Sequence, residues 1–195
     1  MGSGISGNYS GTLEMSQPYS LSYEVCKDML EFDIARGVYV NGTYEKNSTA
    51  KNIYDVINGE YIISNKRNKT MTYVIDLNDN IIVAERNGNG FNGKATPHPT
   101  LIGGKNPRVK MAGILHLKDG KILSYDNMSG HFKPNIKSMK VAKEAFGKLP
   151  DYLFDGGKKK WLRWIMKFVR NYLVVIIWQL LIMSKKNWTI FLIIY

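Results

Sequence analysis

The stretch that decides the fold is HPTLIGGKNPRVKMAGILHLKDGKILSYDNMSGHFKP, residues 98–134. Within it, the β-rich runs 110–117 and 121–126 are joined by a Lys-Asp-Gly turn, whose glycine can adopt a positive φ. This pattern predicts a β-hairpin. His98 and His131 lie on either side of the hairpin in turn-rich sequence, where side chains are often functional.

A second hairpin is predicted upstream. Residues 71–75 and 81–85 are rich in β-formers, and the residues between them are mostly Asp and Asn. Two such hairpins predict an antiparallel sheet of at least four strands. The Gly- and Asn-rich residues 87–107 connect the hairpins as a long loop, and loops of that length in a compact domain are often functional.

Helices are predicted before and after these strands in the sequence. Apolar residues recur every three to four positions over residues 19–34, namely at Leu21, Val25, Met29 and Phe32, which predicts a helix that buries this face. A shorter helix is expected over residues 48–57, with Ser48 as its cap, and another over residues 135–146. The predicted fold class is therefore α+β: two N-terminal helices, the sheet and a following helix, with a hydrophobic, basic C-terminal tail.

The net charge of +11 is concentrated at the C-terminus. Residues 157–195 contain eight Lys or Arg and no Asp or Glu, which leaves 19 basic and 16 acidic residues elsewhere. The body of the chain is thus not the strongly basic surface typical of sequence-independent nucleic-acid binding. We expect a flexible Gly/Ser linker over residues 1–12 and one α+β domain over residues 13–150.

The tail over residues 158–195 combines tryptophans, positive charge and the apolar run 172–183, which predicts an interfacial or weakly spanning membrane segment. A helix of twelve residues is about 18 Å long, short of the roughly 30 Å of a hydrocarbon core. A single spanning helix over residues 164–183 and a non-native, frameshifted tail both stay open. Cys26, the single cysteine, excludes an intrachain disulfide and is expected to be a core thiol.

The histidines are the candidate catalytic residues. Imidazole titrates near neutrality, so His98 and His131 could act as general base and acid in a metal-independent ribonuclease. Further candidate substrate-binding residues are the cations Arg108 and Lys133 and the hydrogen-bonding residues Thr100, Tyr125, Asn127 and Ser129. The alternative that each histidine only holds its loop stays open. His116 alternates with apolar residues and is expected to be an ordinary strand residue, and no ligand spacing favours zinc, so no metal is predicted.

The motifs HPTLIGG and AGILHLKDGKILSYDNMSGHFKP resemble a C-terminal toxin module of bacterial polymorphic toxins. In order and spacing they are also similar to the core of plant IQ-motif calmodulin-binding proteins, over residues 71–146. The resemblance implies a toxin or effector that is secreted or delivered into target cells as part of a larger protein, with a cognate immunity protein as partner. The chain has no IQ helix, so calmodulin binding is not carried over.

Two function classes therefore stay open. The first is an enzyme: the ribonuclease, which acts on RNA without a cofactor, or an NAD-dependent ADP-ribosyltransferase in which His98 and Tyr125 hold a nicotinamide ribose. The second is a non-catalytic interaction module tethered to a membrane by the tail.

Overall fold

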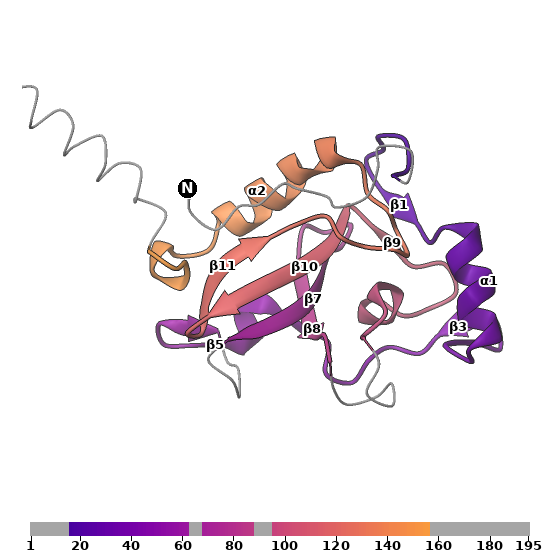
Figure 1. Ribbon diagram of the computed structural model, residues 1–195, viewed down its shortest axis with the longest axis horizontal. Helices are drawn as coiled ribbons and strands as arrows, with labels where there is room; N and C mark the ends of the chain where they lie inside the picture. Colours follow the sequence, from indigo (N-terminus) through magenta and orange to yellow (C-terminus); the bar gives the residue numbers. More distant parts are fainter. Residues whose placement is uncertain (1–15, 63–67, 88–94, 157–195) are drawn as a thin grey trace, which may run out of the picture. The chain divides into compact units, whose positions relative to one another are not determined.

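The computed structural model describes residues 16–62, 68–87 and 95–156. Its centre is a five-stranded antiparallel sheet with the strand order β11-β10-β7-β8-β4 (Figure 1). The strands are β4 (Lys51–Asn52), β7 (Lys69–Ile75), β8 (Ile81–Glu85), β10 (Met111–Lys118) and β11 (Lys121–Tyr125). The two predicted hairpins are therefore present, and pairing of β7 with β10 joins them in one sheet.

Three short pairs of strands lie outside this sheet. They are β1 (Tyr23–Glu24) with β9 (Arg108–Val109), β2 (Tyr39–Val40) with β3 (Thr43–Tyr44), and β5 (Ile57–Asn58) with β6 (Tyr61–Ile62). Each pair contributes only two residues per strand. They fix the course of the connecting segments rather than extend the sheet.

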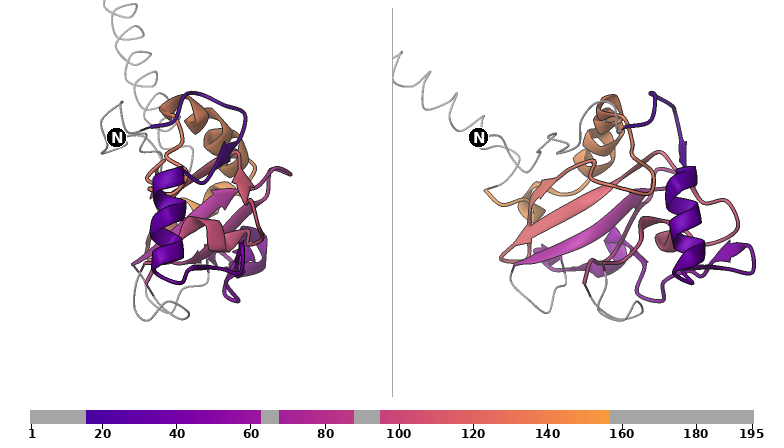
Figure 2. Two further views of the ribbon diagram at one scale, coloured as in Figure 1. Left: turned by 90° about the vertical axis from the view of Figure 1, so that its right-hand side faces the viewer. Right: turned by 45° about the vertical axis from the view of Figure 1, so that its right-hand side comes forward.

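The described residues form two α-helices, α1 (Lys27–Ala35) and α2 (Met139–Gly147). Single 3-10 turns are η2 (Ile53–Val56), η3 (His98–Leu101), η4 (Ile136–Ser138) and η5 (Asp151–Leu153). Figures 1 and 2 show α2 along one face of the sheet and α1 at the end where β1 and β9 lie.

The strand alternation divides the core into two clusters, one on each face of the sheet. On the α2 side, Phe146 stacks on Tyr125 at a centroid distance of 4.1 Å and meets Tyr73 edge-on at 5.2 Å. The other cluster contains Tyr23, Val74, Ala84, Leu101, Val109, Ala112 and Phe132. It packs the loops that carry the two histidines against the sheet.

Gly113 in β10 is required by a close backbone approach. A Cβ atom at this position would lie 2.0 Å from the carbonyl oxygen of Asp126. The chain that follows β11 can therefore run directly over β10, which places the loop containing His131 beside the sheet.

The predicted α+β class, with two helices ahead of the sheet, is wrong. The described residues are mainly strand, and β1 precedes α1. The first predicted helix begins only at Lys27, because Tyr23 is a buried anchor in β1 and its hydroxyl lies 2.6 Å from the Ser138 hydroxyl. Part of the predicted apolar face is not buried. Leu21, which precedes α1, and Phe32 within α1 are both exposed.

The second predicted helix is also wrong. Residues 48–57 contain β4, the turn η2 and the first residue of β5 instead. Lys51 and Asn52 pair with β8, and the Asn52 side chain accepts a hydrogen bond from the Tyr54 amide, which caps η2. Sheet pairing outweighs weak local helix propensity here. The helix predicted after the sheet is present as η4 and α2.

Two further expectations concern residues that the structure does not describe. The Gly/Ser linker over residues 1–12 and the tail over residues 158–195 lie outside the described residues. Within the described part of the chain, no helix has the length and apolar character needed to cross a bilayer. The membrane prediction for the tail therefore stays a prediction.

Candidate functional site

His98 is held in the turn η3, between Pro97 and Pro99. Its Nε2 lies 3.0 Å from the carbonyl oxygen of Gly113 in β10, and the residue is 4% exposed. A carbonyl accepts hydrogen bonds only, so we assign the proton of the neutral ring to Nε2 and the lone pair to Nδ1. Burial, with a contribution from the charge of His131, lowers the pKa of His98 to about 3. His98 is thus a neutral imidazole of fixed tautomer.

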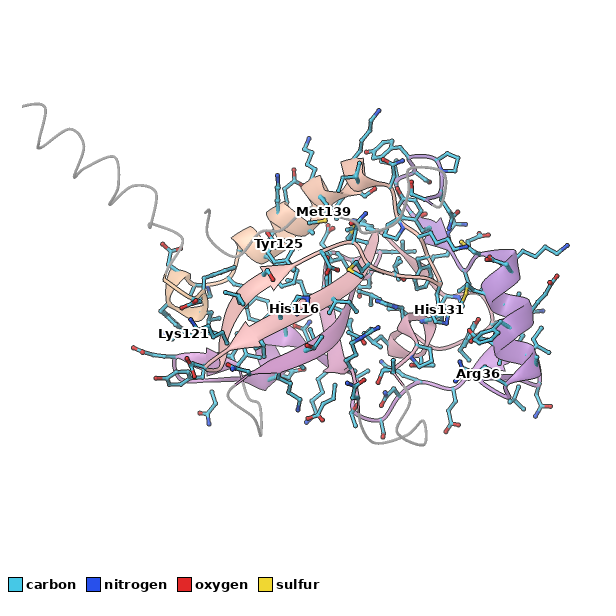
Figure 3. All side chains as sticks on the ribbon, viewed as in Figure 1. Arg36, His116, Lys121, Tyr125, His131 and Met139 are labelled. Atoms are coloured by element: carbon cyan, nitrogen blue, oxygen red, sulfur yellow. The ribbon has the colours of Figure 1, made fainter. Side chains whose placement is uncertain are left out.

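His131 lies in the loop between β11 and η4 and is paired with a carboxylate. Its Nε2 is 3.2 Å from Oδ2 of Asp33 in α1, and its side chain is 14% exposed. Figure 3 shows His131 at the end of the sheet next to α1. A carboxylate on one nitrogen of an imidazole fixes the orientation of the ring.

Asp33 is held in turn by Tyr44. The Tyr44 hydroxyl donates a hydrogen bond of 2.9 Å to Oδ2 of Asp33, and both residues are buried. Burial, followed by the charge of Asp33, raises the pKa of Tyr44 far above its usual range. The result is a connected chain from Tyr44 through Asp33 to His131.

The two predicted catalytic residues come together. The ring centroids of His98 and His131 are 6.1 Å apart, with the ring planes inclined by 52°. The pair combines a neutral imidazole with an imidazole that contacts a buried carboxylate. Groups of one type whose environments differ in this way are typical of sites that assign separate acid and base roles.

Three of the predicted substrate-binding residues are buried, and they lie within a few residues of His98 or His131 in the sequence. Thr100 in η3 donates its hydroxyl to the Pro97 carbonyl at 2.8 Å, and Ser129 accepts a hydrogen bond from the Phe132 amide at 3.3 Å. Asn127 donates to the Pro134 carbonyl at 3.1 Å. All three therefore shape the loops of the histidines.

Asn127 differs from the other two in one respect. Its buried Oδ1 has no hydrogen-bond partner among the described residues. A buried acceptor of this kind costs about 1–3 kcal/mol, so it calls for an explanation such as a ligand or a water molecule. It lies in the same loop as His131.

The predicted cations are both in ion pairs with residues of the N-terminal segment. Nη1 of Arg108 lies 2.6 Å from Oε1 of Glu24, and Nζ of Lys133 lies 2.7 Å from Oδ2 of Asp28. Lys133 follows His131 by two residues.

Tyr125 lies elsewhere. It is buried against Phe146 on the α2 side of the sheet, and Figure 3 shows it beside Met139 and well apart from His131. The structure therefore does not bring Tyr125 and His98 together as two sides of a nicotinamide site.

His116 and Cys26 are not part of the pair. His116 lies in β10 with Nε2 3.6 Å from Oδ2 of Asp126, as a half-exposed strand residue. Cys26 is the residue before α1, and burial raises the pKa of its thiol. Among the described residues, no group of three or more His, Cys, Asp or Glu is placed to hold a metal ion.

Asp33 and Tyr44 are the site residues that sequence reasoning missed. A signal for Asp33 was available, because it continues the row Val25, Met29 at intervals of four residues, where an apolar side chain would be expected. An acidic residue at such a position is either exposed or paired. Tyr44 gives no comparable signal, because its partner comes from a different element.

Comparison with known proteins adds no further assignment. No protein-family model, no curated protein and no solved structure matches this chain.

Proposed function

We propose that this chain is a toxin or effector domain with metal-independent ribonuclease activity, in which His131 is the group that moves the proton. The observation that carries the proposal is the placement of His98 and His131 at 6.1 Å, with His131 on the buried Asp33. The two histidines come from loops 33 residues apart, so sequence proximity does not explain their contact.

Within this mechanism the two rings have different tasks. His131, oriented by Asp33, alternates between protonated and neutral forms and gives its proton to the leaving oxygen. His98 stays neutral, and its Nδ1 accepts a hydrogen bond from the attacking 2′-hydroxyl. Its low pKa makes it a weak base, so its main contribution is to orient that hydroxyl. As the bond from the 2′-oxygen to phosphorus forms and the bond from phosphorus to the leaving oxygen breaks, the 2′-hydroxyl proton passes to solvent water, and water later returns a proton to His131.

The wider biological role rests on the sequence resemblance. We place the domain at the C-terminus of a larger toxin that is secreted or delivered into target cells, with a cognate immunity protein in the producing cell. The orphaned acceptor of Asn127 supports a ligand near the His131 loop. The alternative ADP-ribosyltransferase has no such support, since Tyr125 is part of the core.

The test is inducible expression of the full chain in bacteria, followed by growth, RNA integrity and NAD level. The variants are His131→Ala, His98→Gln and the control His116→Ala, which removes a third histidine that also contacts an aspartate. We expect RNA loss and growth arrest with the unchanged chain and the control, and neither with the first two variants. His98→Gln keeps a donor for Gly113, and circular dichroism verifies folding.

Other outcomes have defined meanings. Undiminished RNA loss in folded His131→Ala refutes the proposal. NAD consumption without RNA loss favours the transferase, and no effect of the unchanged chain at verified protein level favours the interaction module.

A further inference from the structure

Three of the four acidic side chains in the N-terminal segment, residues 23–35, each contact a basic residue from a later part of the chain. Glu24 binds Arg108, Asp28 binds Lys133, and Asp33 binds His131. Arg108 and Lys133 are residues that the sequence predicts to bind substrate, and His131 is the proposed acid. One short segment thus supplies an acidic partner to each of these three basic residues.

The three pairs differ in exposure. Asp33 is buried, and His131 is partly buried, so this pair is the least exposed of the three. The side chains of Glu24 and Asp28 are 63% and 64% exposed, whereas Lys133 beneath Asp28 is only 20% exposed. Asp28 therefore lies over a largely covered cation, whereas Arg108 is itself 45% exposed beside Glu24, and a rotamer change of either carboxylate would break its ion pair.

The outer pairs lie next to the histidine loop. The amide nitrogen of the Gln17 side chain lies 3.0 Å from the Glu24 carbonyl and 2.7 Å from the Phe132 carbonyl. β1 and the loop 131–133 are therefore neighbours, and β9 holds Arg108 on the other side of β1.

We infer that Arg108 and Lys133 each bind a backbone phosphate of single-stranded RNA and so form a phosphate-binding subsite, in which Glu24 and Asp28 occupy the two cations until substrate phosphates replace them. The inference rests on the proposed function for the choice of RNA. Exposed ion pairs contribute little to stability, so an anion can displace either carboxylate at low cost. The Arg108 guanidinium donates hydrogen bonds to two partners at once, from Nη1 to Glu24 and from Nη2 to the Ser22 hydroxyl at 2.9 Å.

A direct consequence is that the N-terminal carboxylates weaken substrate binding. They compete with phosphate for the same two cations, so their removal should increase affinity. Removal of an acidic residue of α1 that contacts neither cation should change the affinity only by a small general effect of charge. Glu31 is a matched control because it lies on the same helix, is 67% exposed and pairs with Lys27.

The experiment measures binding of the full chain to a short 2′-O-methyl RNA, which cannot be cleaved through its 2′-oxygen, over a series of salt concentrations. We expect Glu24→Gln and Asp28→Asn to tighten binding by about two- to fivefold, and Glu31→Gln to change it much less. Arg108→Gln and Lys133→Gln should weaken binding. Each should also reduce the slope of log Kd against log salt by about 0.7, the value for one phosphate contact to a single strand.

Two results with the variants would overturn the subsite. One is equal tightening by Glu31→Gln and the two test variants, which would show a general charge effect. The other is an unchanged salt slope in both cation variants. Inorganic polyphosphate serves as a competitor: displacement of the RNA supports phosphate recognition, and failure to displace it refutes phosphate recognition.

This measurement is separate from catalysis. Binding with the expected variant pattern but without RNA loss in cells would refute the proposed ribonuclease and leave the subsite intact. RNA loss without the variant pattern would do the reverse. Thermal unfolding of each variant verifies that the exposed substitutions leave the fold unchanged.

Discussion

Acidification should destabilise this protein through His98. The native ring has a pKa of about 3, whereas an unfolded histidine titrates near 6.5. Below pH 6.5 the unfolded chain therefore binds a proton that the native state excludes, and stability falls as pH falls towards 3. The slope approaches about 1.4 kcal/mol per pH unit, which amounts to about 2 kcal/mol between pH 7 and pH 5.

The measurement is urea unfolding of the unchanged chain and His98→Gln at pH 7 and at pH 5. Glutamine retains an Nε2 donor for the Gly113 carbonyl but does not titrate, so the variant isolates the protonation of this ring. We expect the unchanged chain to lose about 2 kcal/mol more than the variant over this interval. Other titrating groups are present in both proteins and cancel in the comparison. Equal losses would show that His98 is accessible to protons in the native state, and would refute both its burial and its neutral role.

Three other perturbations test the geometry around the pair. Gly113→Ala should cost about 3 kcal/mol or more in urea unfolding, because its Cβ would lie 2.0 Å from the Asp126 carbonyl oxygen; a change below 1 kcal/mol would contradict the close approach. Tyr44→Phe removes a hydrogen bond to a buried carboxylate and should lower the free energy of unfolding by about 1.5–3 kcal/mol. The control Tyr39→Phe removes a hydrogen bond to the Lys105 carbonyl near solvent and should lower it less. Equal losses in the two variants would argue against a special role of Asp33. In thermal unfolding, Phe132→Ala should cost about 3–5 kcal/mol because Phe132 is buried, and Phe32→Ser should cost less than about 1 kcal/mol because Phe32 is exposed. The reverse order would mean that α1 packs by its apolar side chains.

The sheet was predictable because its signals are local. In both hairpins the strand residues and the turn residues are adjacent in sequence, and the positive φ of Asp79 and of Gly120 falls where the turns were expected. The pairing of β7 with β10, which merges the hairpins, depends on residues far apart in the chain. It could be expected only from the need to bury both faces of the sheet.

The N-terminal third was not predictable from periodicity. The spacing of Ala50, Ile53 and Ile57 fits one face of a helix, yet β4 pairs with β8 and leaves only the turn η2. Such a short segment has little intrinsic helix stability, so a few sheet hydrogen bonds decide its conformation. The same argument explains why the first helix starts late, since Tyr23 is held in β1.

The candidate site was predictable in part for a related reason. The two histidines could be selected because turn chemistry around each is visible in the sequence, but their contact depends on the passage of the chain over Gly113. Their different environments depend on burial and on Asp33, and neither follows from the residues around the histidines. Residue type could therefore nominate the pair, while only the packing could separate its roles.

Charge, and not hydrophobicity, determines how α1 is rotated. A helix placed by its apolar stripe would bury Phe32, yet the single fully buried residue of α1 is Asp33. The neighbouring elements present His131, Tyr44, Lys133 and Arg108 toward this segment, and carboxylates at 24, 28 and 33 meet them. Because a buried carboxylate is costly without partners, the contacts of Asp33 with His131 and Tyr44 stabilise this rotation of the helix. The contacts of Asp33 therefore both stabilise α1 and orient His131, the candidate acid. Substitutions at Asp33 should change both properties together.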